Sequence, residues 1–595
     1  MREFSAPESY DVPATGNLTD AIVANAHEYA DQVALRRRGP DGRWVDVPWR
    51  EFLADVTSLA KGLIGAGVQA GDRIGLMSKT RYEWVVADYA TWFAGATTVP
   101  IYETSSSDQV AWILADSGAV LVFVETRDHV ERVGKARADA AQLRHVVCFD
   151  TGDLDALRAR GAGVRADRLE ARRTESTPQT LATLIYTSGT TGRPKGCMLT
   201  HGNFMFEIAV DVQGLDRLFV NAEAGTLLFL PLAHVFARVI AIACLQRRAL
   251  LGLSADVNHL VDDFGTFRPT FILGVPRVFE KVFNAASQRA TADGHGRLFD
   301  AAAATAIAFS EALERGGPGL LLRARHALFD RLVYRRLRAS LGGRAEWVIS
   351  GGAPLGERLA HFFRGAGVPV LEGYGLTETT AAVTVNTPEF QRIGTVGRPL
   401  AGTSVKVADD GELLFRGGQV FTGYWQNDEA TAEVFEDGWF RTGDVGEVDD
   451  DGYVRITGRK KEIIVTAGGK NVAPAVLEDR LRAHPLVSQC LVVGDGKPFV
   501  AALVTLDPEA LADWVKSHDK TGSIADLASD PDLLAAIQHG VDDANSAVSR
   551  AEGIRKFKVL SIDWTEESGE VTPTLKLKRN LVLATYHDDI ESLYR

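Results

Sequence analysis

The residues best suited to chemistry form a run of glycines and hydroxyl side chains, Leu184-Ile-Tyr-Thr-Ser-Gly-Thr-Thr-Gly-Arg-Pro-Lys195. Glycines let the backbone approach an anion closely, and successive N–H groups and hydroxyls can surround phosphate oxygens. The run does not fit the G-x-x-x-x-G-K-[ST] pattern of a Walker A loop. A flexible turn is the alternative interpretation, but the strand-like segment before it and the lysine after it favour phosphate binding. The predicted phosphate contacts are Thr187, Ser188, Gly189, Thr190, Thr191, Gly192 and Lys195.

A second motif combines an aromatic ring with oxygen ligands, in Glu372-Gly-Tyr-Gly-Leu-Thr-Glu378. A ring between glycines can stack on a purine, and a hydroxyl followed by a carboxylate suits Mg²⁺. Upstream, Ser350-Gly-Gly-Ala-Pro354 could let a base lie against the backbone. Taken alone, the motif is more typical of a packed tyrosine and a surface glutamate.

A third motif is Arg441-Thr-Gly-Asp444, followed by Gly458-Arg-Lys-Lys-Glu462. An aspartate in a glycine turn usually caps the turn. It could also accept hydrogen bonds from both hydroxyls of a ribose, with Arg459 assisting.

Together these motifs, in this order, resemble those of the ATP-dependent, AMP-forming acyl-activating enzymes, also called adenylate-forming enzymes. The resemblance covers nearly the whole chain. Finer features are similar to the long-chain fatty acyl-CoA synthetase branch: Leu230-Pro-Leu-Ala-His-Val-Phe236 and the ending Thr572-Pro-Thr-Leu-Lys-Leu-Lys-Arg579. That ending departs from the G-K-I form common in the superfamily. Lys576 aligns with the catalytic lysine, and Lys578 stays open as an alternative.

The resemblance implies a role for each motif. Lys576 would reach the α-phosphate, Thr187 and Glu378 would hold Mg²⁺, and His234 would line the junction of the acyl and nucleotide pockets. Lys461 would lie at a hinge between two domains. Nucleotide contacts would come from the phosphate run and from Gly351, Gly352, Glu372, Gly373, Tyr374, Gly375, Thr377, Asp444, Arg459 and Lys576.

The implied reaction is that of a long-chain fatty acid–CoA ligase. A fatty acid and ATP would give an acyl-adenylate and pyrophosphate, and coenzyme A would then give acyl-CoA and AMP. A fatty acyl-AMP ligase that passes the acyl group to a carrier-protein thiol is the nearest alternative. A silent binding protein would have lost some of these residues, whereas all are present. A serine hydrolase lacks support, because no G-x-S-x-G elbow occurs.

These residues need a multidomain α/β scaffold to position them. Helical spacing alternates with short apolar strands such as Arg73–Met77 and Val120–Val124, which predicts parallel α/β layers. We expect an N-terminal domain over residues 1–458, with a helical insertion at about 279–344, broken at Gly316-Gly317-Pro318, and a small β-rich unit at about 396–456. A hinge at 459–461 would lead to a smaller, mobile α+β domain at 462–595.

One glycine pattern, Gly65-Ala-Gly-Val-Gln-Ala70, fits the loose dinucleotide motif G-x-G-x-x-[GA]. It follows a helical segment and leads into a strand, which is the reverse of the order that pyrophosphate binding requires. We interpret it as the end of a helix and a turn.

Composition narrows the classes further. The 595 residues carry 65 basic and 78 acidic side chains, a net charge of -13, which argues against nucleic acid as a partner. Four cysteines without a C-x-x-C pair predict a reduced, cytoplasmic protein. Neither a signal peptide nor an apolar run of spanning length is visible. The oligomeric state stays open.

The segment Arg323–Arg338 is the one strongly basic stretch, with six arginines and a single acid, Asp330. Apolar residues interleave with the arginines at helical spacing. Peripheral contact with an anionic membrane is one interpretation. The alternative is a helix with one face on the core and solvated arginines outside.

Overall fold

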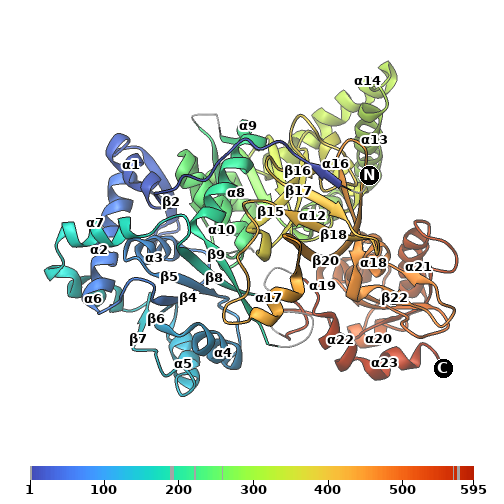
Figure 1. Cartoon of the computed structure of the whole chain (residues 1–595). Coiled ribbons are helices and arrows are strands. Elements are labelled where there is room, and N and C mark those ends of the chain that lie inside the picture. Colours follow the sequence, from blue (N-terminus) through green and yellow to red (C-terminus); the bar gives the residue numbers. More distant parts are fainter. Residues whose placement is uncertain (1–2, 188–192, 220–222, 257–258, 567, 573–575) are drawn as a thin grey trace.

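The computed structural model describes residues 3–187, 193–219, 223–256, 259–566, 568–572 and 576–595 (Figure 1). A large N-terminal part contains three mixed sheets and a β-rich unit. A smaller C-terminal part, orange to red in Figure 1, lies against one side of it. This is the multidomain α/β architecture expected from the sequence.

The first sheet carries the phosphate run at its edge, in the strand order β7-β6-β4-β5-β8-β9. Its strands are β4 (Arg73–Met77), β5 (Thr97–Ile101), β6 (Ala119–Val124), β7 (His145–Cys148), β8 (Leu181–Thr187) and β9 (Lys195–Thr200). α2 (Trp49–Gly65) precedes these strands, and the helices between them are α3 (Tyr82–Phe93), α4 (Ser107–Ser117), α5 (Arg127–Ala136), α6 (Asp153–Arg160) and α7 (Ala166–Glu175). As expected, α2 ends at Gly65, and Gly67 turns the chain with a φ of 92°.

The edge of this sheet differs from the expected parallel layers. β8 and β9 pair antiparallel, with Thr187 opposite Lys195. The phosphate run therefore connects two neighbouring antiparallel strands. A short connection can join antiparallel strands, whereas parallel strands need a long crossover.

Two further sheets complete the α/β layers. The second has the order β10-β11-β2-β3, and the third β12-β13-β14-β15-β16. Their strands are β2 (Val33–Arg38), β3 (Trp44–Pro48), β10 (Gly225–Leu228), β11 (Leu250–Leu253), β12 (Phe271–Gly274), β13 (Trp347–Ser350), β14 (Val370–Leu376), β15 (Ala381–Val385) and β16 (Arg398–Pro399). The helices packed with these sheets are α1 (Asp20–Glu28), α8 (His201–Gly214), α9 (Asp216–Phe219), α10 (Val235–Arg247), α11 (Leu260–Phe267) and α16 (Glu357–Gly365).

The stretch expected to be a helical insertion is helical. It comprises α12 (Pro276–Ala292), α13 (Gly296–Glu314), α14 (Leu320–Phe329), a π-helical turn (Asp330–Tyr334) and α15 (Arg335–Ser340). The predicted break at Gly316-Gly317-Pro318 separates α13 from α14. In Figure 1 the end of this pair projects from the body of the molecule.

The β-rich unit is a six-stranded sheet with the order β1-β17-β18-β20-β19 and with β21 paired to β20. Its elements are β1 (Glu3–Ser5), β17 (Ser404–Val407), β18 (Glu412–Arg416), α17 (Asp428–Val434), β19 (Phe435–Glu436), β20 (Trp439–Val448) and β21 (Val454–Arg459). The sequence did not predict β1, which crosses from the N-terminus to pair with β17 (Figure 1).

The C-terminal part is an α+β unit. Its strands are β22 (Ile464–Val465), β23 (Asn471–Val472), β24 (Val487–Val493), β25 (Val500–Leu506) and β26 (Ile554–Val559). Its helices are α18 (Pro474–Arg482), α19 (Pro508–Ser517), α20 (Ile524–Leu527), α21 (Pro531–Asn545), α22 (Arg579–Thr585) and α23 (His587–Ser592).

Hydrophobic packing separates the two parts of the molecule. Two apolar clusters contain only residues from Ile464 onward. The buried residues of the other three clusters all precede this point, and the last of them are Val454 in one cluster and Phe440 in another. The parts therefore have their own cores. Within the described ranges, no helix has the length and apolar character needed to cross a bilayer.

Candidate active site

A cavity of about 1500 Å³ lies where the two parts of the molecule meet. Its walls carry residues from the predicted phosphate, purine and ribose motifs and from the C-terminal part, including Thr187, Tyr374, Arg459 and Lys576. Segments nearly 400 residues apart in the sequence thus share one cavity.

Lys576 brings a cation from the C-terminal part into this cavity. Its Cε lies 3.9 Å from the point where a Cβ on Gly352 would be. The surrounding protein and the Arg459 guanidinium lower the pKa of Lys576 to about 8, whereas Asp444 and Glu378 act in the opposite direction. Lys578, the residue before α22, also lines the cavity. Its backbone N–H donates to the Glu570 carbonyl.

Tyr374, Asp444 and Arg459 form one hydrogen-bonded unit. The Tyr374 hydroxyl donates to Asp444 Oδ2 at 2.6 Å, and Arg459 Nε lies 2.9 Å from Asp444 Oδ1. The unit forms because β20 and β21 pair with Asp444 opposite Arg459. The Tyr374 ring also packs against Phe415, with ring centroids 5.9 Å apart. The predicted purine and ribose motifs are therefore adjacent.

Glu378 and Thr187 meet around Cys197. The Thr187 hydroxyl lies 3.8 Å from the Cys197 sulfur, and burial together with the Glu378 carboxylate raises the pKa of that thiol. Glu378 Oε1 accepts a hydrogen bond of 2.9 Å from the Tyr424 hydroxyl. One carboxylate and one hydroxyl at a cavity wall fit Mg²⁺, which prefers oxygen ligands and shares its coordination with waters and substrate phosphates.

Only the two ends of the phosphate run are described. The predicted contacts Ser188, Gly189, Thr190, Thr191 and Gly192 lie outside the described residues. At the far end, Lys195 Nζ lies 5.2 Å from the centroid of the Tyr424 ring. Tyr424 therefore contacts both the end of the run and Glu378.

The glycines of the second motif form the cavity wall between β13 and β14. Gly351, Gly352, Gly373 and Gly375 line the cavity, and so does Thr377. A Cβ on Gly351 would lie 3.4 Å from the Phe236 ring. At the four glycines the wall exposes backbone without side chains, against which a base could lie.

Glu372, predicted to contact nucleotide, has a different setting. Its carboxyl group is buried and accepts a hydrogen bond of 2.9 Å from the Leu355 backbone N–H. Burial raises the pKa of Glu372 to about 8. The side chain therefore holds the turn that follows Gly351 and Gly352.

His234 is the N-cap residue of α10 and lines the cavity. Its Nδ1 accepts a hydrogen bond of 3.2 Å from the Phe236 backbone N–H. Burial and the nearby Lys576 ammonium lower the pKa of His234 to about 3. The imidazole is thus neutral, and the bond to Nδ1 assigns its proton to Nε2.

Lys461 lies in a short 3-10 turn, Lys460–Glu462, that joins the two parts of the molecule. It is exposed and lines the cavity. Its neighbour Lys460 pairs at 2.5 Å with Asp410 and at 3.2 Å with Glu412 of the β-rich unit.

The sequence did not identify Tyr424 and Glu412. Glu412 accepts hydrogen bonds from the Gly443 backbone N–H at 2.9 Å and from Arg441 at 2.6 Å, and so orients the turn that bears Asp444. Both residues lie outside the predicted motifs, and no local pattern distinguishes them. Only the pairing of β18 with β20 brings Glu412 beside that turn.

Comparison with known proteins identifies the family of this chain. Residues 22–425 match the model of the AMP-binding enzyme family, and residues 461–595 match that of the AMP-binding enzyme C-terminal domain. The chain therefore belongs to the AMP-binding enzyme family.

Within that family, two relatives match the chain along the full length of both proteins. It is 52% identical to the long-chain-fatty-acid–CoA ligase FadD15 of Mycobacterium bovis and 51% identical to FadD15 of Mycobacterium tuberculosis. Among solved structures, the adenylation domain of a carboxylate reductase from Mycobacterium chelonae aligns with a TM-score of 0.74 and 23% identity, over 97% of this chain and 91% of that one. The anthranilate CoA ligase AuaEII aligns with a TM-score of 0.72 and 22% identity, over 97% and 98%. These two show the same fold.

Proposed function

We propose that this protein is a long-chain fatty acid–CoA ligase that forms an acyl-adenylate from ATP and then an acyl-CoA. Full-length identity of 52% to a long-chain-fatty-acid–CoA ligase carries the proposal. The cavity supports it, because Lys576, Tyr374 and the end of the phosphate run converge there.

In the first half-reaction, a carboxylate oxygen of the fatty acid bonds to the α-phosphorus of ATP. The bond from that phosphorus to the bridging oxygen breaks, and pyrophosphate leaves. Lys576 would stabilise the negative charge that develops on the phosphate oxygens. Neutral His234 would donate a hydrogen bond from Nε2. It is not needed as a base, because the carboxylate is already ionised at neutral pH.

Nucleotide binding would use the hydrogen-bonded unit described above. Tyr374 would stack on adenine beside Gly351 and Gly352. Asp444 would accept hydrogen bonds from the ribose hydroxyls, since each carboxylate oxygen has a second lone pair. Thr187 and Glu378 would hold Mg²⁺, which supplies charge neutralisation at the phosphates when bound.

In the second half-reaction, the thiol sulfur of coenzyme A bonds to the acyl carbon, the thiol proton leaves to solvent, and the bond from that carbon to AMP breaks.

We propose that the domains divide at 458 and 462, and that residues 459–461, with Lys461, act as the hinge. Rotation of the C-terminal part would withdraw Lys576 and open a path for the thiol. The separate hydrophobic cores support such a rotation.

The decisive experiment measures AMP release with ATP and fatty acids of two to twenty carbons, with and without coenzyme A. The ligase predicts stoichiometric AMP and acyl-CoA that require all three substrates, with the highest kcat/KM for long chains. Accumulation of acyl-adenylate without thioester would instead support the fatty acyl-AMP ligase that passes its product to a carrier protein.

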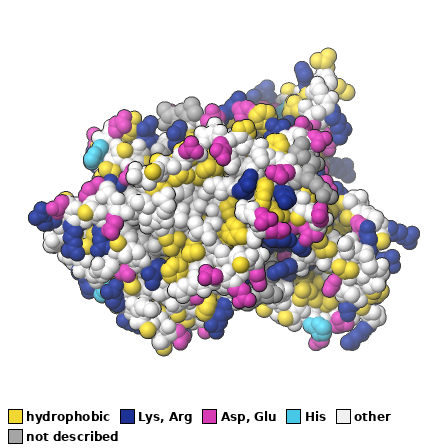
Figure 2. All heavy atoms as spheres, in the orientation of Figure 1, with side chains coloured by type: hydrophobic (Ala, Val, Ile, Leu, Met, Phe, Trp, Pro, Cys, Tyr) yellow, Lys and Arg dark blue, Asp and Glu magenta, His cyan; other side chains and the backbone are white. Residues whose placement is uncertain are grey.

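We further propose that the projecting helical pair contacts anionic membrane, the source of the fatty acid. Leu320 and Leu321, at the start of α14, are 84% and 86% exposed. Exposed arginines surround them, and Figure 2 shows hydrophobic and basic side chains together at this projecting end. The other face packs inward through Phe329, Tyr334 and Leu337. Exposed apolar side chains next to cationic ones suit the interface of an anionic bilayer.

Flotation with phosphatidylglycerol vesicles tests this contact. The double variant Leu320→Ser with Leu321→Ser should lose vesicle binding, while Val261→Ser, a change at another exposed apolar residue, should retain it. Equal flotation of the wild-type protein and the two variants would contradict the membrane proposal. It would not bear on the ligase proposal.

A further inference from the structure

Two buried acids lie one helical turn apart in α8, and one of them lines the cavity. α8 contributes Glu207 and Asp211, which are 0% and 7% exposed. Asp211 lines the cavity together with Leu215, Val239 and Val385. An acyl chain whose carboxylate lies near His234 and Lys576 would extend towards this apolar wall.

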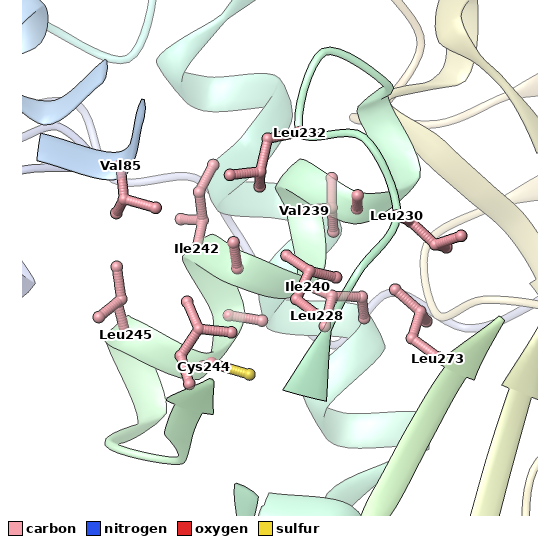
Figure 3. Close-up of a cluster of buried hydrophobic side chains, with 14 of the residues drawn as sticks. Val85, Leu228, Leu230, Leu232, Val239, Ile240, Ile242, Cys244, Leu245 and Leu273 are labelled. Carbon is pink, nitrogen blue, oxygen red and sulfur yellow. The ribbon is translucent and has the colours of Figure 1, made fainter. Parts of the chain in front are cut away.

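Aliphatic side chains of α10 line the same cavity as Asp211. Figure 3 shows Val239 and Ile240 of α10 within a cluster of buried aliphatic side chains that includes Leu228 and Leu230. Val239 and Ile240 also line the cavity. Such a wall suits a methylene chain, so carboxyl groups within it need an explanation.

Hydrogen bonding does not satisfy these two carboxyl groups. Glu207 Oε1 accepts a bond of 2.7 Å from the Ala382 backbone N–H, but Oε2 has no partner among the described residues. The Asp211 carboxyl makes no side-chain hydrogen bond to any described residue. Burial raises the pKa of Asp211 to about 7 and that of Glu207 well above its ordinary range. A neutral carboxyl can both donate and accept, and an unsatisfied buried polar group is costly.

We infer that Asp211, backed by Glu207, is a specificity determinant that favours fatty acids carrying a hydroxyl group within the chain. A hydroxyl at the depth of Asp211 would make the hydrogen bond that the protein leaves open. A plain methylene at that depth makes no such bond, so a hydrogen bond to a substrate hydroxyl would discriminate between the two kinds of acid. The inference rests on the proposed ligase function and specifies its substrate class.

A positional scan with the full-length enzyme tests the inference. The kcat/KM for AMP release is measured with hexadecanoic acid and with hexadecanoic acids hydroxylated at single positions from carbon 2 to carbon 16. We expect one or two adjacent positions to exceed the others by about tenfold, the equivalent of about 1.4 kcal/mol. A flat profile, with no hydroxylated acid better than hexadecanoic acid, would overturn the inference.

Variants at Asp211 assign the preference to its carboxyl group. Asp211→Leu should abolish the positional maximum, and Asp211→Asn, which can still hydrogen-bond, should keep most of it. The control Ile240→Val enlarges the same wall without a polar group and should keep the maximum. A maximum that survives Asp211→Leu would overturn the assignment. Turnover of any of these long-chain acids, hydroxylated or not, separates the two proposals, because its complete absence contradicts the ligase function itself.

Discussion

Lys576 is the residue whose charge state matters most to the proposed chemistry. Its cavity setting lowers its pKa to about 8, so the side chain is a cation below that pH and becomes neutral as the pH rises through it. Only the cation can stabilise charge on phosphate oxygens. The same residue therefore sets both the strength and the pH range of the first half-reaction.

We predict that kcat/KM for adenylate formation falls as the pH rises through about 8, because this parameter reports ionisations of the free enzyme. Lys576→Arg should be slower at every pH but should lose this falling limb, since arginine stays charged. The pH dependence of adenylate formation is measured as fatty-acid-dependent exchange of pyrophosphate into ATP from pH 6.5 to 9.5. The control Lys578→Arg should keep the limb. A limb unchanged in Lys576→Arg would assign the ionisation to another group.

Individual site residues were predictable from sequence only where they lie in a recognisable motif. Tyr374, Asp444 and Arg459 do so, and the structure joins them into one unit. Tyr424 has no local signal, because its role depends on contact with Glu378, 46 residues away in the chain. The Glu372 side chain holds the Leu355 turn, and only the fold brings these two residues together.

Secondary-structure elements followed the sequence where apolar periodicity is strong. The predicted strand Arg73–Met77 and the break between α13 and α14 agree with the structure. The short β1 was missed because Glu3–Ser5 has no strand pattern and its partner, β17, lies about 400 residues away. The antiparallel pairing of β8 with β9 was missed for a different reason: the residues of a strand do not specify the direction in which its neighbour runs.

The bulge in β14 depends on a glycine. β14 pairs with β15 through a shift in register between Tyr374 and Gly375. A Cβ on Gly375 would lie 1.4 Å from the Ala381 carbonyl oxygen, a distance that the backbone cannot tolerate. The bulge lies between Tyr374 and Glu378, two of the predicted site residues.

We predict that Gly375→Ala lowers stability by about 3 kcal/mol and removes most ligase activity, because β15 must move away. Thermal unfolding and AMP release measure the two effects. Gly134→Ala, in α5, is the matched control: its Cβ would meet nothing within 4 Å, so stability should stay level or rise. Wild-type stability and activity in Gly375→Ala would contradict the role of the bulge.

At the scale of the whole molecule, polar contacts hold the two parts in the observed arrangement. Arg277 of α12 donates to the Ser488 hydroxyl at 3.3 Å and lies 3.6 Å from the Asp507 carboxylate. No hydrophobic cluster spans the two parts among the described residues. A polar contact of this kind is weak enough to break and re-form during each turnover.

We predict that Arg277→Gln slows adenylate formation several-fold, because it weakens the arrangement that places Lys576 in the cavity. Thioester formation from pre-made acyl-adenylate should be unchanged or faster. Lys281→Gln, at an exposed position of the same helix, should alter neither step. Equal slowing of both half-reactions in Arg277→Gln would show that the contact does not control domain arrangement.

The most direct test of the account compares the two half-reactions in Lys576→Ala. Fatty-acid-dependent exchange of pyrophosphate into ATP should fall by about a hundredfold or more, since a preorganised charge at the transition state is lost. Conversion of pre-made palmitoyl-adenylate and coenzyme A to palmitoyl-CoA should remain close to the wild-type rate. If the exchange persisted, or if both rates fell equally, the lysine from the C-terminal part would not serve the first step alone, and the central claim would be wrong.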